Sequence, residues 1–310
     1  MSTIVLGSIN IDLVFQTSRL PGKGETIAGH NFLTIAGGKG ANQAVAAAKL
    51  GVKTHMIGRV GDDVFGGSLL AGLVAHNINI EGVRITPDCS SGIASIAVAE
   101  NGDNTIIIIP GANHTLDDDD LEKLRKIAPR ASSLLLQLEI PLEIVQKAAL
   151  IGKRAGIKVI LDPAPAPTRL PDCLYSLVDI ITPNETEASR LVGFPVDDES
   201  SARKAVQFFH DKGVETVVLK QGDRGIFWSD GGEFFHLAAL PVTVVDTVAA
   251  GDAFNGALAA AIDEGLLLHE AMTWGMAAGA LAVTKPGAQS SLPDKATFEA
   301  FLARSGFLKN

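Results

Sequence analysis

From about residue 40 onward, the hydrophobic positions follow two alternating patterns. Short runs rich in Val, Ile and Leu predict buried strands at 53–59, 133–138, 157–161, 178–182 and 216–219. Between them, apolar residues recur with helical spacing, as at 44–50, where Gly51 ends the segment, and in a helix that Pro141 would open and Gly156 would end. This alternation is typical of an α/β fold with a central, mostly parallel sheet flanked by helices, the Rossmann type of layering.

Two segments depart from this alternation and predict a small second sheet. Residues 11–34 contain no convincing helix, and residues 92–109 have the pattern of two strands joined at Asn101-Gly102, a strong hairpin signal. The apolar residues of both segments must cover something. We interpret them as a β-sheet lid over a binding site and as the surface of a homodimer, with an ordinary surface hairpin as the alternative. The chain is then one domain, 1–310, with a lid subdomain from about 11–34 and 92–109.

The charge distribution argues against a nucleic-acid partner. The chain carries 26 Lys and Arg against 35 Asp and Glu, a net charge of −9, and no basic run that could follow a phosphate backbone. Four aspartates, 117–120, follow Thr115 and predict a solvent-exposed helix start, where carboxylates suit the helix dipole. An anionic ligand would therefore need a local source of positive potential, such as a helix N-terminus or a bound metal.

Composition points to a globular protein without membrane contact. Hydrophobic residues make up 46% of the chain and charged residues 20%. No apolar run has the length of a membrane span and the N-terminus lacks the basic region of a signal peptide, so we expect a cytoplasmic location. Cys89 and Cys173 lack zinc-binding spacing and are expected to be reduced thiols.

The segment 246–256 contains small residues that lead directly into an apolar helix expected at 253–262. Ala249, Ala250 and Gly251 would let the backbone approach a ligand, and the first N–H groups of the helix have no partner within it. Such a turn can hold phosphate oxygens, with Asp252 beside the reacting group. The alternative is that Asp252 merely caps the helix.

A second glycine-rich segment lies at 36–43 and resembles two known phosphate-binding motifs without matching either. A P-loop requires Ser or Thr after the lysine, but Gly40 follows Lys39. The dinucleotide fingerprint requires a third small residue where Gln43 stands. What remains is a loop that can bring backbone N–H groups and the Asn42 amide to a hydroxylated ligand, or a simple loop-to-helix turn.

Other polar residues follow predicted strands. Asn10 and Asp12 come just after the first strand, and Glu139 follows another, so all three could border a crevice at the carboxyl ends of the sheet. Turn formation is the alternative for each. Asn184 and Glu187 have the spacing of a capping box, but could equally lie near nucleotide phosphates, with Glu187 on Mg²⁺ through water. The turn at 220–225 suits a nucleotide and is common in any protein.

These segments, in this order, resemble the ribokinase group of carbohydrate kinases over residues 7–293. Residues 37–43 resemble the family's first signature and 246–256 its second, and 7–12, 163–166 and 183–187 are also similar. The resemblance implies ATP-dependent phosphorylation of D-ribose at the 5-hydroxyl, giving D-ribose 5-phosphate. The acceptor could instead be 2-deoxyribose, another small sugar or a nucleoside. A silent sugar-binding regulator is a different class, against which the intact Asp252 and its anion hole argue.

The resemblance also implies roles for individual residues. The sugar would be held by Asn10, Asp12, Gly38, Lys39, Asn42, Glu139 and Asp252. Asp252 would be the base, with an anion hole formed by Ala249, Ala250 and Gly251. The ATP site would be lined by Asn184, Lys220, Gly222, Asp223, Gly225, Gly251 and Met276, and Glu187 would organise Mg²⁺. An activating K⁺ would be bound by Asp246, Val248, Ala282, Lys285, Gly287 and Ser291.

Four positions depart from the family's usual residues. Lys220 replaces a Thr, Met276 replaces a His or Asn, and Asp162 stands where many members have Asn. The first two affect expected nucleotide contacts. Ala249 replaces a Gly, a milder change because alanine still leaves the backbone accessible.

Overall fold

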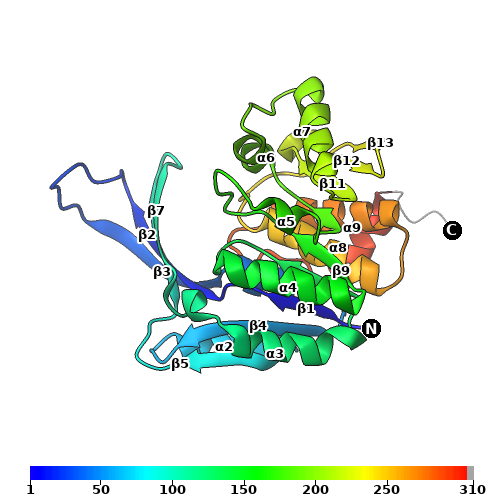
Figure 1. Ribbon diagram of the computed structural model, residues 1–310. Helices are drawn as coiled ribbons and strands as arrows, with labels where there is room; N and C mark the ends of the chain where they lie inside the picture. The colour runs from blue at the N-terminus through cyan, green and yellow to red at the C-terminus, as the bar shows by residue number, and fades with distance from the viewer. Residues whose placement is uncertain (306–310) are drawn as a thin grey trace.

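The computed structural model describes residues 1–305 and contains two β-sheets (Figure 1). The larger sheet has nine strands in the order β13-β12-β11-β10-β9-β8-β1-β4-β5. Pairing is parallel from β11 to β5, and antiparallel for β11–β12 and β12–β13. The strands are β1 (Thr3–Leu6), β4 (Thr54–Gly61), β5 (Asn79–Thr86), β8 (Ser133–Leu136), β9 (Lys158–Leu161), β10 (Ile180–Ile181), β11 (Thr216–Lys220), β12 (Ile226–Asp230) and β13 (Glu233–Leu237). The mostly parallel sheet predicted from the sequence is therefore confirmed.

Helices cover both faces of this sheet, each over its own hydrophobic cluster. One face holds α1 (Lys39–Lys49), α2 (Gly66–Ala75), α8 (Ala250–Asp263), α9 (Leu268–Ala282) and α10 (Lys295–Arg304). The other holds α3 (Asp118–Ile127), α4 (Leu142–Ala155), α5 (Asp172–Tyr175), α6 (Glu185–Val192) and α7 (Glu199–Asp211). Strand side chains alternate between the clusters: Val5 belongs to the first, Ile4 and Leu6 to the second. Burial on both faces explains why the strands are continuous hydrophobic runs.

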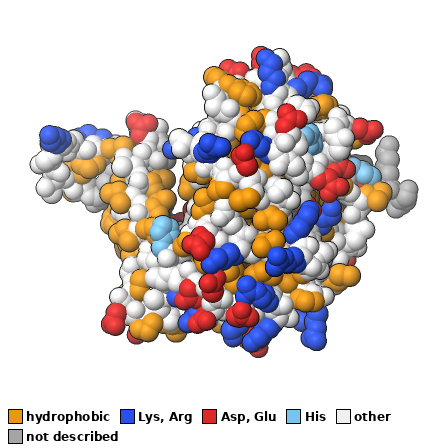
Figure 2. Space-filling view, viewed as in Figure 1, with side chains coloured by type: hydrophobic (Ala, Val, Ile, Leu, Met, Phe, Trp, Pro, Cys, Tyr) orange, Lys and Arg blue, Asp and Glu red, His pale blue; other side chains and the backbone are white. Residues whose placement is uncertain are grey.

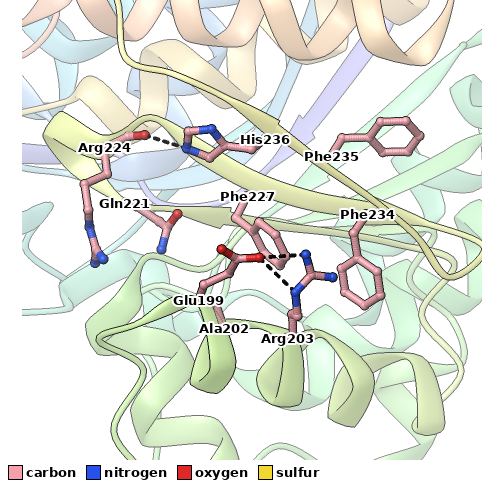
Figure 3. Close-up of a pocket in the computed structure, with 9 residues that line it drawn as sticks. All are labelled: Glu199, Ala202, Arg203, Gln221, Arg224, Phe227, Phe234, Phe235 and His236. Atoms are coloured by element: carbon pink, nitrogen blue, oxygen red, sulfur yellow. Dashed lines mark hydrogen bonds and ion pairs between the residues drawn. The ribbon is translucent and has the colours of Figure 1, made fainter.

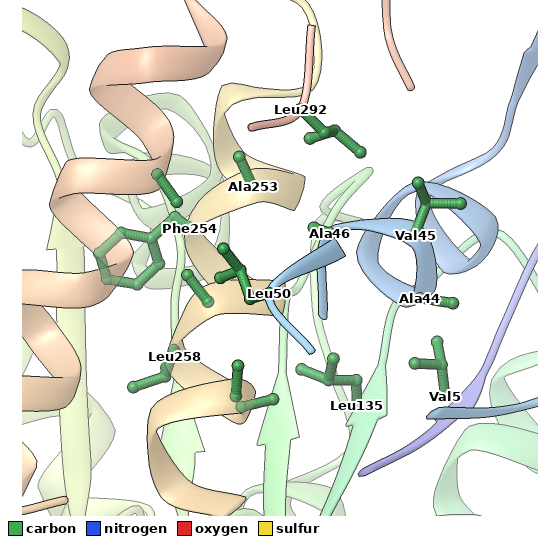
Figure 4. Close-up of a cluster of buried hydrophobic side chains, with 14 of the residues drawn as sticks. Val5, Ala44, Val45, Ala46, Leu50, Leu135, Ala253, Phe254, Leu258 and Leu292 are labelled. Carbon is green, nitrogen blue, oxygen red and sulfur yellow. The ribbon is translucent and has the colours of Figure 1, made fainter. Parts of the chain in front are cut away.

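Helices α1 and α8 approach closely within the first cluster (Figure 4). A Cβ at Gly256 of α8 would lie 2.4 Å from the Ala46 Cβ and 2.8 Å from the Gln43 carbonyl oxygen, so only glycine permits this distance. Because both helices begin at the same edge of the sheet, the contact brings their first turns together. The two glycine-containing segments that the sequence singled out thereby become neighbours.

The second sheet projects from the body of the molecule, with a hollow between the two (Figures 1 and 2). Its strand order is β3-β2-β6-β7, with β2 (Asn10–Thr17), β3 (Gly29–Gly37), β6 (Gly92–Ala99) and β7 (Asn104–Ile109). The pair β2–β6 is parallel, and β6 and β7 form the hairpin expected around Asn101-Gly102. Four consecutive isoleucines of β7, residues 106–109, are each 48–62% exposed.

Three short 3-10 helices complete the described chain: η1 (Gly111–Thr115), η2 (Ala128–Arg130) and η3 (Gly222–Arg224). No helix in residues 1–305 combines the length and the apolar character that crossing a bilayer requires.

Two local predictions were wrong. Pro141 precedes α4 and does not open it. The aspartate run is not wholly solvent-exposed: Asp117 caps α3, but Asp120 is fully buried, and its Oδ2 lies 2.8 Å from the Arg59 Nε of β4. A buried carboxylate requires a charged or hydrogen-bonding partner, and that partner comes from a distant strand.

Candidate functional site

The site lies where the order of the strands reverses. After β1, the next strands of this sheet, β4 and β5, are added on one side of β1. The strands from β8 onward are added on its other side, so β1 and β8 flank a topological switch point. Glu139 follows β8 at this edge. Its Oε2 accepts hydrogen bonds from the Ser8 hydroxyl at 2.5 Å and from the Lys39 N–H at 3.0 Å. One carboxylate thus joins the ends of both strands to the start of α1.

The glycine loop before α1 is held tightly against the end of β1. Gly38 has φ 87°, and a Cβ there would lie 2.7 Å from the Asn10 nitrogen. A Cβ at Gly40 would lie 2.6 Å from the Gly7 carbonyl carbon. These contacts require glycine at both positions. They explain in physical terms why the loop has this composition, and they place Asn42 and Gln43 in the first turns of α1 with buried side chains.

Asp252 is the buried centre of a hydrogen-bond network. It is the third residue of α8, after the left-handed Ala249 (φ 59°), so it does not cap the helix. Its Oδ2 accepts from Asn42 Nδ2 at 3.0 Å and its Oδ1 from Gln43 Nε2 at 3.1 Å. In residues 1–305, the N–H groups of Gly251 and Asp252 have no hydrogen-bond partner. The Ala250 N–H, another of the predicted donors, lies 3.4 Å from the Thr247 carbonyl oxygen. The turn therefore offers free donors at Gly251 and Asp252 beside a carboxylate.

Burial and charge change the acid–base properties of this cluster. Burial raises the pKa of Asp252 to about 6. The pKa of Asp12 is likewise raised to about 6, first by burial and then by the nearby charges of Glu139 and Asp252. Burial alone would lower the pKa of Lys39, but the surrounding carboxylates, above all Asp252, outweigh it and raise the pKa. Lys39 therefore stays charged, and the two aspartates titrate near pH 6.

Asn10 and Asp12 lie in the first residues of β2, where the small sheet leaves the body. Asn10 is 6% exposed, and its Oδ1 accepts from Asn113 Nδ2 at 2.7 Å. The Asp12 carboxylate lies over Gly37, where a Cβ would be 2.4 Å from its Oδ2. The structure thus brings Asn10, Asp12, Gly38, Lys39, Asn42, Glu139 and Asp252 into one region.

The residues expected to contact ATP lie at the ends of β10 and β11. Asn184 caps α6 in a reciprocal capping box with Glu187, whose pKa is raised by burial. An isolated parallel bridge pairs Asn184 with Lys220. Gly222 and Gly225 have φ 58° and 91°, and Asp223 lies between them in η3. Met276 is instead a residue of α9, and its side chain belongs to the hydrophobic cluster that includes α8 and α9.

The residues expected to bind K⁺ come from two segments that Asp246 joins. Its Oδ1 accepts from the Val248 N–H at 3.0 Å, and its Oδ2 from the Gly287 N–H at 2.9 Å. The Asp246 N–H donates to the Val283 carbonyl. The structure therefore brings the start of α8 next to the end of α9, where Ala282 is the last helical residue, and the segment after it, which contains Lys285, Gly287 and Ser291.

The sequence assigned no role to two members of the network, Asp162 and Gln137. Asp162, 2% exposed, accepts from Gln43 Nε2 at 3.0 Å and from Lys220 Nζ at 2.9 Å. Gln137 Nε2 donates to Gln43 Oε1 at 2.6 Å. Asp162 follows β9 as Glu139 follows β8, so the rule that ligands bind at the carboxyl ends of strands could have identified it.

A separate pocket of about 370 Å³ lies between α7 and the β12–β13 hairpin (Figure 3). Arg203 is bonded to Glu199 there, and its guanidinium lies 4.7 Å from the centre of the Phe234 ring. Only Gln221 and Arg224, from the predicted turn at 220–225, line this pocket, and no residue predicted to hold the sugar or take its proton does. The polar cluster at the strand ends, not this cavity, is therefore the candidate active site.

Comparison with known proteins relates the chain to carbohydrate kinases. Residues 2–295 match the model of the pfkB family carbohydrate kinases. A ribokinase from Haemophilus influenzae is 44% identical over 291 residues, which cover 94% of this chain and 95% of the relative. A deoxyribokinase from Salmonella typhi is 39% identical over 303 residues, 98% of this chain and 99% of the relative. The structure of Arabidopsis thaliana ribokinase complexed with ribose and ATP is similar at a TM-score of 0.90 and 38% identity, covering 97% of this chain and 98% of that one.

Proposed function

The chain belongs to the pfkB family of carbohydrate kinases, and from this premise we propose that it phosphorylates D-ribose at the 5-hydroxyl, with ATP as donor, to give D-ribose 5-phosphate and ADP. One observation carries the proposal within the site. The buried Asp252 carboxylate lies in the same helical turn as two free N–H groups and within hydrogen-bond distance of Asn42. A carboxylate that can serve as the base and N–H groups that can form an anion hole are thus adjacent, which supports phosphoryl transfer to a hydroxyl.

The sugar would lie over the ends of β1 and β8. Asn10, Asp12 and Asn42 offer donors and acceptors for hydroxyls, and the Glu139 carboxylate fixes the loop that carries Lys39. Asp252 would orient the 5-hydroxyl and take its proton. With a pKa of about 6, this carboxylate is mostly ionised at pH 7. It need not be a strong base, because the transition state of phosphoryl transfer is loose and the enzyme mainly aligns donor and acceptor.

The nucleotide would lie along α6, β11 and the loop of η3, with its triphosphate directed at the first turn of α8. Among residues 1–305, no three or more His, Cys, Asp and Glu side chains are grouped so that they could hold a metal ion. Mg²⁺ usually keeps several waters and binds one or two carboxylates plus substrate phosphates, so it needs no such group. Glu187 is the residue suited to hold its water shell. Mg²⁺ would supply charge neutralisation at the phosphates.

We also propose a K⁺ site at the backbone around Asp246. The two hydrogen bonds of this carboxylate hold the segments before α8 and after α9 together, and the proposed ligands come from both sides of this junction. Such an ion would supply a fixed positive charge that shapes the turn at Ala249. The proposed ligands are Asp246, Val248, Ala282, Lys285, Gly287 and Ser291.

The small sheet is proposed to act as a lid and as a dimer surface. Its strand β2 begins with Asn10 and Asp12, so movement of the sheet would change access to the sugar and exclude water, a competing acceptor. The exposed isoleucines of β7 form an apolar surface that a second copy of this chain would cover. A cytoplasmic location completes the proposal, because the reaction consumes ATP.

A coupled assay of ADP release against a panel of acceptors tests the function. The panel contains D-ribose, 2-deoxy-D-ribose, D-fructose and adenosine, and the product is identified by mass spectrometry and NMR. We expect D-ribose to have the highest kcat/KM. The similarity to deoxyribokinases makes 2-deoxyribose the second candidate. If 2-deoxyribose had the highest kcat/KM, it would be assigned as the acceptor in place of ribose, and the assignment as a kinase would stand. No turnover with any acceptor, combined with tight sugar binding, would refute the kinase assignment and favour a regulator.

A further inference from the structure

A buried ion pair lies at the point where phosphate and sugar would meet. Lys220 ends β11 and Asp162 follows β9, and the Lys220 Nζ lies 2.9 Å from the Asp162 Oδ1. The side chains are 15% and 2% exposed. Sequestering two charges is costly, and such a pair is often no more stabilising than apolar residues of the same volume. Its location therefore suggests a contribution to the reaction more than to stability.

The lysine ammonium reaches the anion hole itself. A Cβ at Gly251 would lie 3.2 Å from the Lys220 Nζ, so glycine at this position lets the ammonium approach the first turn of α8. The N–H of Gly251 has no partner in the described chain. Any phosphate oxygen that accepts from this N–H would lie close to the ammonium as well.

Asp162 also connects this cation with the proposed base. Its second oxygen, Oδ2, accepts from Gln43 Nε2, and the same amide nitrogen donates to Asp252 Oδ1. The donation from Gln137 to Gln43 Oε1 fixes which way the Gln43 amide faces. The ammonium is therefore held at a defined distance from the base through one amide and one carboxylate.

We propose that Lys220 is a catalytic residue that contacts the transferred γ-phosphoryl group, and that Asp162 is a positioning residue that holds its ammonium beside Gly251. The inference rests on the proposed kinase function. In the transfer, the sugar O5–phosphorus bond forms, the bond from phosphorus to the β,γ-bridging oxygen breaks with its electron pair going to ADP, and the hydroxyl proton goes to Asp252. Lys220 exchanges no proton. It neutralises negative charge on the equatorial oxygens, because a charged donor is preorganised where that charge develops.

Nucleotide binding tests the contact without turnover. Affinities of AMP-PNP and ADP are measured by calorimetry with Mg²⁺ for the wild type, Lys220→Met and Lys220→Arg. Since only AMP-PNP has a γ-phosphoryl group, Lys220→Met should weaken it by about tenfold or more and ADP by less than about threefold. Lys220→Arg should retain most of the wild-type affinity for AMP-PNP, because arginine keeps the positive charge. Equal losses for both nucleotides would overturn the proposal, because a structural role would not distinguish them.

Steady-state kinetics test the catalytic part. Lys220→Met should lower kcat by about 100-fold, with KM for the sugar within about threefold of wild type. Asp162→Asn should lower kcat less, by about tenfold, because the ammonium remains but is no longer held. The matched control is Lys158→Met, which removes the exposed partner of Glu215 at the opposite end of β9 and should change neither value. Wild-type kcat in Lys220→Met would refute the role.

The double variant Asp162→Asn/Lys220→Met guards against a folding defect, since it leaves no unpaired buried charge. The double variant should fold, have a kcat as low as that of Lys220→Met, and have lost the wild type's preference for AMP-PNP over ADP. Wild-type kcat in the double variant would refute the proposal, because it would show that the two side chains only neutralise each other's charge. Failure of the proposed function can be distinguished from failure of this inference. A wild type that binds AMP-PNP but phosphorylates no acceptor would refute the function. The comparison of AMP-PNP with ADP would still decide whether Lys220 contacts the γ-phosphoryl group.

Discussion

Replacement of Asp252 by Asn is the most direct perturbation of the proposed base. The side chain keeps its shape but loses its charge and one acceptor. At present both carboxylate oxygens accept from amides, those of Asn42 and Gln43. An Asn side chain has one acceptor and one NH₂ group, so in either orientation one of these amides would face another donor.

The two energetic consequences for stability oppose each other. An unpaired buried donor costs about 1–3 kcal/mol. The rise of the Asp252 pKa from 3.8 to about 6 means that its charged form is disfavoured by roughly 3 kcal/mol in the folded state. The variant removes that cost. The thermal unfolding midpoint of Asp252→Asn should therefore stay within a few degrees of wild type.

Activity should change far more than stability. Loss of a positioned general base typically costs about 100-fold or more in kcat. Coupled ADP-release kinetics should show this decrease, with KM for ribose and for ATP within about threefold of wild type. The matched control is Asp179→Asn, which alters a buried carboxylate bonded to Lys153 and to the Val159 N–H, at the opposite end of the sheet. It should lower the unfolding midpoint and leave kcat unchanged. A folded Asp252→Asn enzyme with kcat within about fivefold of wild type would refute the role of Asp252.

Three further predictions follow from the site. The value of kcat/KM should fall below about pH 6, by tenfold per pH unit or more steeply, because Asp252 and Asp12 must be ionised. The pKa values of both groups are raised above those in the unfolded chain, so their protonation stabilises the folded state between about pH 6 and 4, and activity should be lost before the protein unfolds. A flat profile down to pH 5 would contradict this prediction. Asp12→Ala should weaken ribose binding and shrink a preference for ribose over 2-deoxyribose that is roughly tenfold or more in wild type; equal use of both sugars by the wild type would contradict it. K⁺ should give clearly higher activity than Na⁺ at equal ionic strength, and Asp246→Asn should reduce this difference; equal rates in both salts would count against the cation site.

The parts of the fold that could be predicted have strong local periodicity. The strands β4, β8, β9, β10 and β11 were located within a few residues, because strands buried on both faces are short hydrophobic runs bounded by turn residues. The family resemblance, drawn from two glycine-containing segments in a fixed order, is confirmed by the match over residues 2–295. Close backbone contacts at Gly38, Gly40 and Gly256 explain why those segments have the residues that made them recognisable.

Pairs of side chains from distant strands could not be predicted in the same way. Lys220 and Asp162 are 58 residues apart and meet only because β10 alone separates β9 from β11. Strand order is a property of the whole sheet, and no local pattern specifies it. For the same reason Asp120 was expected in solvent, although Arg59 of β4 lies beside it in the structure. Each residue, taken alone, fits a loop or a helix start equally well.

Asn184 and Glu187 show that a local explanation of a residue does not exclude a functional one. The sequence left capping and nucleotide binding as alternatives, and the structure contains the complete capping box: Glu187 accepts from the Asn184 N–H at 2.8 Å and from its Nδ2 at 2.9 Å. Those bonds hold the Glu187 carboxylate at the first turn of α6, beside the bridge from Asn184 to Lys220. A carboxylate without such bonds would be free to change rotamer and could not hold the water shell of a metal at a fixed position. Capping is therefore the means by which this helix presents Glu187 to the proposed nucleotide site, and both interpretations of the motif apply to the same atoms.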